Sequence, residues 1–334
     1  MEKDELDKQF DFIRVFGAVM VILLHTTIMY SGVGVVTPKI PSEFFKFLSW
    51  YLASFLMELF IVLSGIIYGI CLKRPIGYIG LSMLLSKFKR LMIPYYLTGI
   101  LYVAPIIIYF KITKERYLEY LIKGIFLAKN NRHLWYLLTL FDIFIFVNIF
   151  QFFITIEPKN VFFFIISVFL MIITRKVPDI FCFNRALYFL CFFCLGYLIY
   201  DKLEIINSYF TEHLSLWINF GFLSFPLSLY GRWVYNPGKA VRALAAVFFY
   251  FYLARILSRS WISNNFLFRI LLKNSMGIYL IHPMLLYCMY FKYAQNEINP
   301  FIMVFSTSII SIIISVIISE LLRLFHLGFW LGEY

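Results

Sequence analysis

Long apolar runs separated by short polar connections make up almost the whole chain. A bilayer core is about 30 Å thick, and a helix needs roughly 20 mostly apolar residues to cross it. The pattern therefore predicts an all-α fold, a polytopic membrane helical bundle of about ten transmembrane helices. The expected spans are residues 12–31, 47–72, 91–110, 134–154, 161–174, 186–200, 214–230, 240–257, 276–292 and 301–322.

Three prolines, Pro105, Pro226 and Pro283, fall inside these spans. Each is expected to kink its helix, because proline removes a backbone donor. The connections are mostly brief, and the sequence shows no low-complexity tract. No cleavable signal peptide is evident, since the first residues mix Glu, Lys and Asp. We therefore expect one membrane domain over residues 1–334.

The composition excludes a soluble domain, because 62% of the 334 residues are hydrophobic and only 14% are charged. The formal net charge of +12 could suggest nucleic acid, but the basic residues lie in short loops between apolar runs. Anionic lipid headgroups and an anionic ligand explain this charge better, so no nucleic-acid partner is expected. Lysine and arginine divide equally between the two sides, so charge bias alone does not orient the chain.

The first span carries two ionisable side chains. Arg14 lies near its start, and His25 lies well inside it, eleven positions later. At 3.6 residues per turn the two side chains point the same way, about 16 Å apart along the helix. An ionisable group at that depth is a functional-site hypothesis by default. The alternative is a histidine satisfied by a hydrogen bond to a neighbouring helix.

The second span contains a lone carboxylate, Glu58, which must pair, become protonated or take part in chemistry. It lies at a depth where it could meet His25, orient the imidazole and raise its basicity. The alternative is a polar residue bonded to another helix. Ser64 and Gly65 follow in the same span and allow close helix approach, and Ser64 is a candidate substrate-lining residue.

A basic pair, Lys87 and Arg90, precedes the third span. The two side chains share one face of the helix because they are three positions apart. Pro94 follows in the first turns, where proline is tolerated. Two cations at a helix start suit a phosphate-bearing ligand as well as lipid headgroups. The simpler interpretation of this stretch alone is a basic membrane flank.

Two weaker motifs supply further candidate substrate-lining residues. Arg132, His133 and Trp135 stand at the start of the fourth span, where an interfacial aromatic belt is the alternative explanation. His282 is a second intramembrane imidazole, in the ninth span, and Tyr279 precedes it by about one turn on the same face. We favour a structural or substrate-lining role for His282 over catalysis.

The spacing of Cys191 and Cys194 resembles that of a metal site, but no second cysteine pair accompanies them. We interpret them as small apolar residues within a helix. No metal site is expected.

Together these stretches resemble the acyltransferase-3 family of integral membrane acyltransferases, over essentially the whole chain. Four features carry the resemblance: the Arg14 and His25 pair, the segment Glu58–Gly65, the pair Lys87 and Arg90 before Pro94, and the weaker motifs His133–Trp135 and Tyr279–His282. Lys87 stands where the family has an arginine, which keeps the charge but loses the bidentate fork.

The resemblance implies acyl transfer from an acyl-CoA, most often acetyl-CoA, to a carbohydrate hydroxyl. The expected acceptors are cell-surface polysaccharide, lipopolysaccharide or a lipid-linked glycan precursor. It also implies a bacterial cytoplasmic membrane location with a cytoplasmic N-terminus. Arg14, Lys87 and Arg90 are then predicted to bind the coenzyme. His25 and Glu58 are the predicted catalytic residues, with His25 as general base or as a covalent acyl relay.

The rival hypothesis is a transporter that exports a surface glycan or its precursor, which intramembrane His and Glu residues and kinked helices would permit. The sequence shows no pair of matching broken half-helices, which disfavours it. A third hypothesis is a membrane assembly protein without chemistry, and the buried ionisable residues argue against that.

Overall fold

The computed structural model describes residues 2–72, 80–151, 159–174, 177–225 and 237–334, and every regular element in these ranges is a helix. The predicted all-α fold is therefore confirmed. The α-helices are α1 Glu2–Thr27, α2 Glu43–Ala53, α3 Leu56–Leu72, α4 Leu81–Lys87, α5 Ile93–Thr98, α6 Ala104–Tyr109, α7 Tyr117–Tyr120, α8 Trp135–Ile149, α10 Lys159–Ile173, α11 Phe183–Ile199, α12 Leu203–Glu212, α13 Leu214–Ser224, α14 Pro237–Ser258, α15 Phe266–Tyr293 and α16 Pro300–Leu324.

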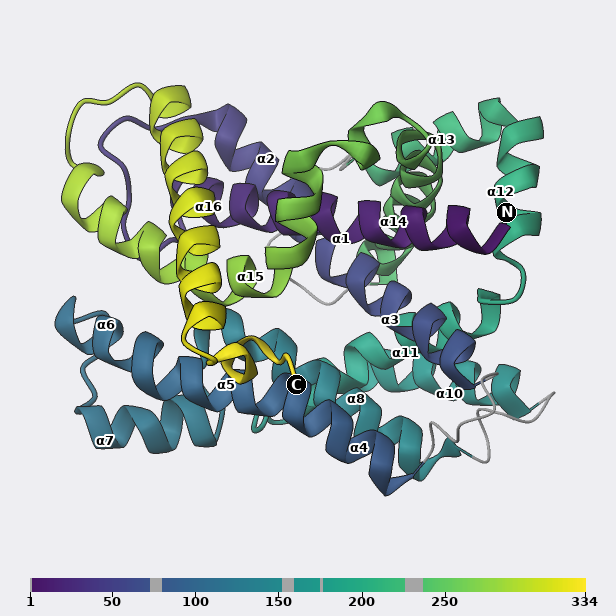
Figure 1. The fold of residues 1–334 in the computed structure, drawn as a ribbon, viewed down its shortest axis with the longest axis horizontal. Coiled ribbons are helices and arrows are strands. Elements are labelled where there is room, and N and C mark those ends of the chain that lie inside the picture. The colour runs from purple at the N-terminus through teal and green to yellow at the C-terminus, as the bar shows by residue number, and fades with distance from the viewer. Residues whose placement is uncertain (1, 73–79, 152–158, 175–176, 226–236) are drawn as a thin grey trace.

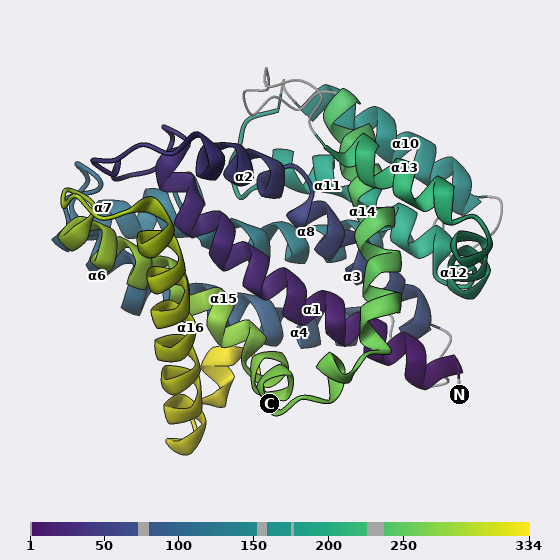
Figure 2. The same ribbon diagram turned by 90° about the horizontal axis from the view of Figure 1, so that it is seen from above.

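The helix α1 runs through the middle of the molecule, and the other helices pack around it (Figure 1). Its N-terminal end lies near α12, and its C-terminal end lies at the opposite end of the molecule, near α2 and α16 (Figures 1 and 2). The helices α14, α15 and α16 all contact α1. A residue's position along α1 therefore determines which end of the bundle its side chain lies in.

Six helices in the described ranges are long and apolar enough to cross a membrane, so the predicted count of about ten is not confirmed. These six are Asp4–Tyr30, Glu43–Leu72, Leu81–Tyr109, Arg132–Ile149, Lys239–Ser258 and Pro300–Leu324. The spans predicted at 161–174, 186–200 and 214–230 coincide with three shorter apolar helices. The ninth predicted span lies inside α15, which has 28 residues but is diluted by polar ones such as Asn274 and His282.

The helices α3 and α11 pack closely, and two glycines let their backbones approach each other. A Cβ atom on Gly65 would lie 2.1 Å from the carbonyl oxygen of Phe193. A Cβ atom on Gly196 would lie 2.1 Å from the carbonyl oxygen of Val62. Small residues at such contacts allow van der Waals packing between membrane helices. The prediction that Gly65 permits close helix approach is confirmed.

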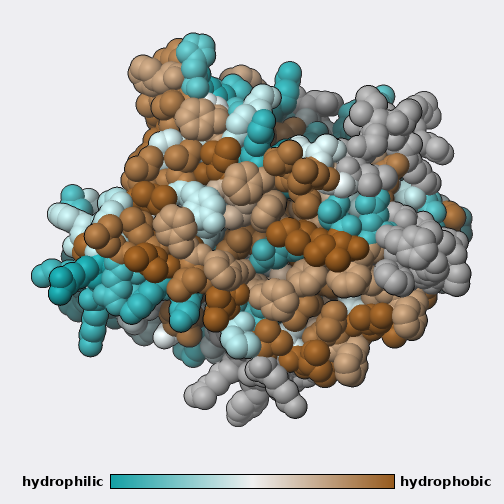
Figure 3. Space-filling view, turned by 90° about the horizontal axis from the view of Figure 1, so that it is seen from below, coloured by the Kyte–Doolittle hydropathy of each residue, from teal (hydrophilic) through white to brown (hydrophobic). Residues whose placement is uncertain are grey.

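The helix α16 places its polar side chains inside the bundle. Ser311, Ser315 and Ser319 recur every four residues, so they share one face, and all three are buried. A Cβ atom on Gly277 of α15 would overlap the side chain of Ser319. The opposite face exposes large apolar residues such as Ile313. Apolar side chains also cover much of the molecular face in Figure 3, as expected of a surface in contact with lipid.

The helices differ in their backbone structure around the prolines. Pro105 follows a π-helical segment, Gly99–Val103, and Pro94 follows another, Phe88–Met92. These wider turns interrupt the regular hydrogen-bond ladder directly before each proline, which lacks the donor that the ladder requires. Pro283 lies inside the continuous helix α15. Pro226 lies outside the described residues.

We expect Gly65→Ala and Gly196→Ala each to lower the free energy of unfolding by about 1–3 kcal/mol, because each added methyl group would force α3 and α11 apart. Thermal unfolding of the purified protein in detergent measures this loss. The control is Gly328→Ala, whose Cβ atom would meet its nearest neighbour, Glu333, at an ordinary 3.4 Å. Equal melting temperatures for Gly65→Ala and wild type would contradict the packing argument.

Candidate active site

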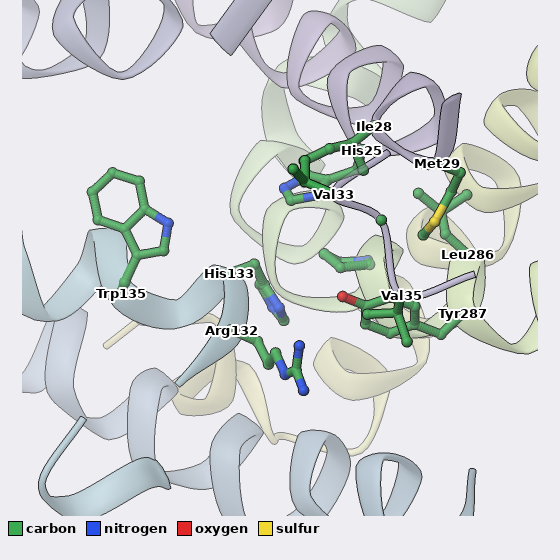
Figure 4. A pocket seen from close by; sticks show the side chains of 12 residues that line it. His25, Ile28, Met29, Val33, Val35, Arg132, His133, Trp135, Leu286 and Tyr287 are labelled. Carbon is green, nitrogen blue, oxygen red and sulfur yellow. The ribbon is translucent and has the colours of Figure 1, made fainter. Parts of the chain in front are cut away.

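A cavity of about 160 Å³ lies where the C-terminal end of α1 meets the start of α8 and the middle of α15 (Figure 4). A short 3₁₀ turn, Arg132–Leu134, leads into α8 at this point. The lining residues are His25, Ile28, Met29, Val33, Gly34, Val35, Arg132, His133, Trp135, Pro283, Leu286 and Tyr287.

Three histidines from distant parts of the chain meet beside this cavity: His25 and His133 line it, whereas His282, also predicted to line the substrate site, is buried behind them and does not. The ring centroids of His25 and His282 are 5.2 Å apart, and those of His133 and His282 are 6.4 Å apart. His133 and His282 are buried, whereas His25 is partly exposed on the cavity wall. The histidine pairs span α1, the turn before α8 and α15, so only the tertiary fold brings these side chains together.

Hydrogen bonds fix the tautomers of the two buried rings. His282 Nδ1 donates to the carbonyl oxygen of Ile278 at 2.6 Å, and His133 Nε2 donates to that of Leu280 at 3.1 Å. In a neutral imidazole the second nitrogen then carries a free lone pair. The second nitrogens, His282 Nε2 and His133 Nδ1, are buried and have no partner among the described residues. The cluster therefore offers unused proton acceptors.

Side chains from three other elements hold α15 in place around Pro283. The carbonyl oxygens of residues 280–282 accept hydrogen bonds from His133, Tyr102 and Ser311, respectively. The proline lacks an N–H group, so the helix is locally weaker there and gains from outside support. This segment of α15 is consequently fixed relative to the start of α8.

Three predicted lining residues, Arg132, His133 and Trp135, do line the cavity. The Trp135 side chain lies well away from the others in Figure 4, and it stacks on Phe189 with a centroid distance of 5.6 Å. The hydroxyl of Tyr279 donates to the carbonyl oxygen of His133. Tyr279 thus positions the histidine rather than lining the cavity.

Ser64 is not among the lining residues. Its Oγ donates to the carbonyl oxygen of Phe60 at 2.9 Å, within its own helix α3. A serine hydroxyl in an apolar helix commonly satisfies itself in this way. The prediction that Ser64 lines the substrate site is not supported by its position.

Glu58 does not meet His25, contrary to the predicted pairing. Its buried carboxylate lies 3.6 Å from Lys239 Nζ and accepts a hydrogen bond from the hydroxyl of Tyr188 at 3.4 Å. These partners belong to α14 and α11, and neither of them lines the cavity. Lys239 was missed in the sequence analysis, because a single lysine at the start of a span resembles an interfacial flank. In this fold Glu58 links three helices.

The predicted coenzyme-binding cations lie away from the cavity. Arg14 pairs with Asp11 at 3.4 Å, eleven positions before His25 on α1. Lys87 Nζ lies 4.3 Å from the ring centroid of Phe144, and Arg90 is exposed. None of the three lines the cavity.

Two parts of the cavity wall were missed from the sequence. Tyr287 follows Pro283 by four residues, so helical spacing from the Tyr279–His282 motif could have identified it. The loop residues Val33–Val35 carry no chemical signal and reach the cavity only because the chain turns back after α1. Such a turn has no periodicity from which to predict it.

The fold and the cavity define an integral membrane protein with a polar, histidine-lined site inside a helical bundle. The family model Acyl_transf_3, described as an acyltransferase domain, matches residues 7–320. The chain therefore belongs to the acyltransferase-3 family, as its motifs indicate. Searches of curated proteins and of solved structures find no match.

The contacts of Glu58 generate a stability prediction. Lys239→Met should destabilise the protein by about 3–5 kcal/mol, because it leaves a buried carboxylate without its cation. Adding Glu58→Gln to that variant should recover much of the loss, since the neutral amide removes the uncompensated charge. Thermal unfolding in detergent measures both.

The matched control for this pair is Lys123→Met, which removes the cation of the exposed pair with Glu119. Solvent screens that pair, so its loss should change the melting temperature far less. If Lys239→Met were no more harmful than Lys123→Met, the contact with Glu58 would have no structural importance.

Proposed function

We propose that this protein is a membrane O-acyltransferase that moves an acyl group, most simply acetyl, from acyl-CoA to a hydroxyl of a cell-surface polysaccharide, lipopolysaccharide or lipid-linked glycan precursor. Family membership supports acyl transfer and gives no support to the transporter alternative. The observation that carries the proposal is the position of His25 on the cavity wall, beside a second imidazole and an arginine.

In this proposal His25 is the general base for the acceptor hydroxyl. A neutral imidazole within reach of a hydroxyl can take its proton as the oxygen attacks the thioester carbonyl. The ring next to His25 is His282, so the neighbouring group is an imidazole and not the carboxylate of Glu58. A covalent acyl-histidine intermediate on His25 is the alternative chemical route.

We propose that the two substrates approach from opposite sides of the membrane. With the N-terminus in the cytoplasm, Arg14 and Arg90 would bind the coenzyme phosphates at the inner rim. The thioester would then reach about 16 Å along α1 to His25. The cavity lies beside the far end of α1 and the loop that follows it, which suits an acceptor arriving from the outer side.

The first functional prediction concerns His25→Ala. We expect this variant to lose about 100-fold or more of the transfer rate, because it removes the proposed base and leaves the fold intact. The measurement is release of free coenzyme A from acetyl-CoA by purified protein with a cell-envelope glycan preparation. Mass spectrometry of surface glycans, with and without the gene, identifies the acyl group transferred.

The control is His213→Ala, since His213 is an exposed histidine that stacks on Tyr209 away from the cavity. This variant should keep the wild-type rate. Near wild-type transfer by His25→Ala would refute the assignment of the base. An active His25→Ala protein would also exclude an acyl-histidine intermediate at this position.

The second functional prediction concerns Arg90→Ala. We expect its KM for acetyl-CoA to rise by about tenfold, because a charge-assisted hydrogen bond to phosphate would be lost. The KM for the acceptor should stay unchanged. The control is Arg116→Ala, which removes another exposed arginine. An unchanged KM for acetyl-CoA would make Lys87 and Arg90 a basic membrane flank.

A further inference from the structure

The cavity contains a cation without a counter-charge. Arg132 lines it, and none of the lining residues is an aspartate or glutamate. No ion pair to Arg132 occurs among the described residues within 4.0 Å. A partly buried cation in a membrane protein normally pairs with an anion, because removal from water is costly. The cavity is therefore suited to a ligand or intermediate that carries negative charge.

One hydrogen-bond donor of the Arg132 guanidinium group is unsatisfied. Arg132 Nε is buried and makes no hydrogen bond with the described part of the chain. The group lies beside the hydroxyls of Tyr120 and Tyr287, which do not supply a charge. An unsatisfied buried donor is uncommon in proteins and calls for an explanation. Arg132 lines the cavity, so an anion bound there would supply its guanidinium group with both an acceptor and the missing counter-charge.

The backbone also holds this side chain in an unusual place. Arg132 has a φ of +53°, in the left-handed region that residues with a Cβ atom rarely adopt. Backbone of this kind persists only where the surrounding structure enforces it, and it clusters at functional sites. The strain places Arg132 and His133 on the same cavity, and Figure 4 shows both pointing toward the space below His25.

The proposed reaction creates an anion in this space. We infer that Arg132 is a further catalytic residue, whose guanidinium donates to the oxyanion that forms when the acceptor hydroxyl attacks the acyl carbonyl. This inference rests on the proposed function. Hydrogen-bond donors fixed beside a developing charge are often the largest single contribution to catalysis, since a water-poor site strengthens them.

The proposed transfer passes through a tetrahedral intermediate. The hydroxyl oxygen forms a bond to the thioester carbon while His25 accepts the hydroxyl proton. The carbonyl π electrons move to oxygen, and Arg132 binds the resulting oxyanion. When the carbonyl re-forms, the carbon–sulfur bond breaks, and the thiolate leaves with its electron pair. The proton on His25 then passes to sulfur, which gives the acyl ester and free coenzyme A.

The alternative ligand for Arg132 is an anionic group on the acceptor itself. In that case Arg132 would contribute to substrate binding and not to the chemical step. The two roles differ in kinetics. An interaction made only in the transition state changes kcat, whereas one made equally in the bound substrate changes KM. Comparing a neutral acceptor with an anionic one of the same shape separates them.

The experiment uses purified full-length protein, acetyl-CoA as donor and two probe acceptors, neutral octyl glucoside and anionic octyl glucuronide. The variants are Arg132→Ala, Arg132→Lys and Arg132→Gly, and Lys129→Ala is the control for a nearby basic residue. We expect Arg132→Ala to lower kcat about 100-fold or more with either probe, with both KM values changed less than about twofold. Arg132→Lys should recover part of the rate because it restores the charge.

Chemical rescue provides an independent readout. The Arg132→Gly variant also relieves the backbone strain, so its melting temperature should be no lower than that of wild type. Millimolar guanidinium should restore its kcat several-fold and should not affect Lys129→Ala. A wild-type kcat in Arg132→Ala, or a loss confined to the KM for octyl glucuronide, would overturn the inference. If wild type released no more coenzyme A than His25→Ala, the proposed function itself would fail.

Discussion

The histidine-lined cavity depends on the hydrogen bonds that α15 accepts around Pro283. Side chains of His133, Tyr102 and Ser311 donate to consecutive carbonyl oxygens of residues 280–282. Inside a bilayer a free carbonyl is expensive, because no water is available to satisfy it. Pro283 frees the carbonyl oxygen of residue 279, and His133, which donates to the carbonyl oxygen of the next residue, links the start of α8 to α15 beside it. His133 has two roles, because its ring donates a hydrogen bond to a carbonyl oxygen of α15 and also lines the cavity.

In the rest of the bundle, polar and apolar side chains are arranged in the opposite way from those of a soluble protein. The polar stripe of Ser311, Ser315 and Ser319 faces inward, and the apolar side of α16 faces outward. Lipid is as apolar as the core, so burial of apolar surface does not drive these helices together. Close contacts at Gly65 and Gly196, and links such as Glu58 to Lys239, have to supply the attraction instead. A rigid scaffold of this kind can hold a polar cavity without collapsing it.

The sequence predicts the helices and the candidate residues better than it predicts their partners. Apolar run length located the helical segments, including the short predicted spans 161–174 and 186–200, which coincide with two shorter apolar helices. Motifs placed His25, Arg132 and His133 among the candidates, and all three line the cavity. The predicted partner of Glu58 was wrong. The depth of a residue along a helix can be derived from the sequence, but the direction of its side chain around the helix axis depends on packing.

The geometry of α1 gives a physical reason for the proposed separation of the two substrates. A helix is stiff over its length, so the eleven positions between Arg14 and His25 act as a fixed spacer of about 16 Å. Charged phosphates need a water-exposed rim, whereas the developing oxyanion benefits from a site with little water. The stiff helix α1 extends from one of these environments to the other, so it meets both requirements. In the proposed reaction, shortening or bending α1 between the two residues would misplace the thioester without touching any residue that binds either substrate.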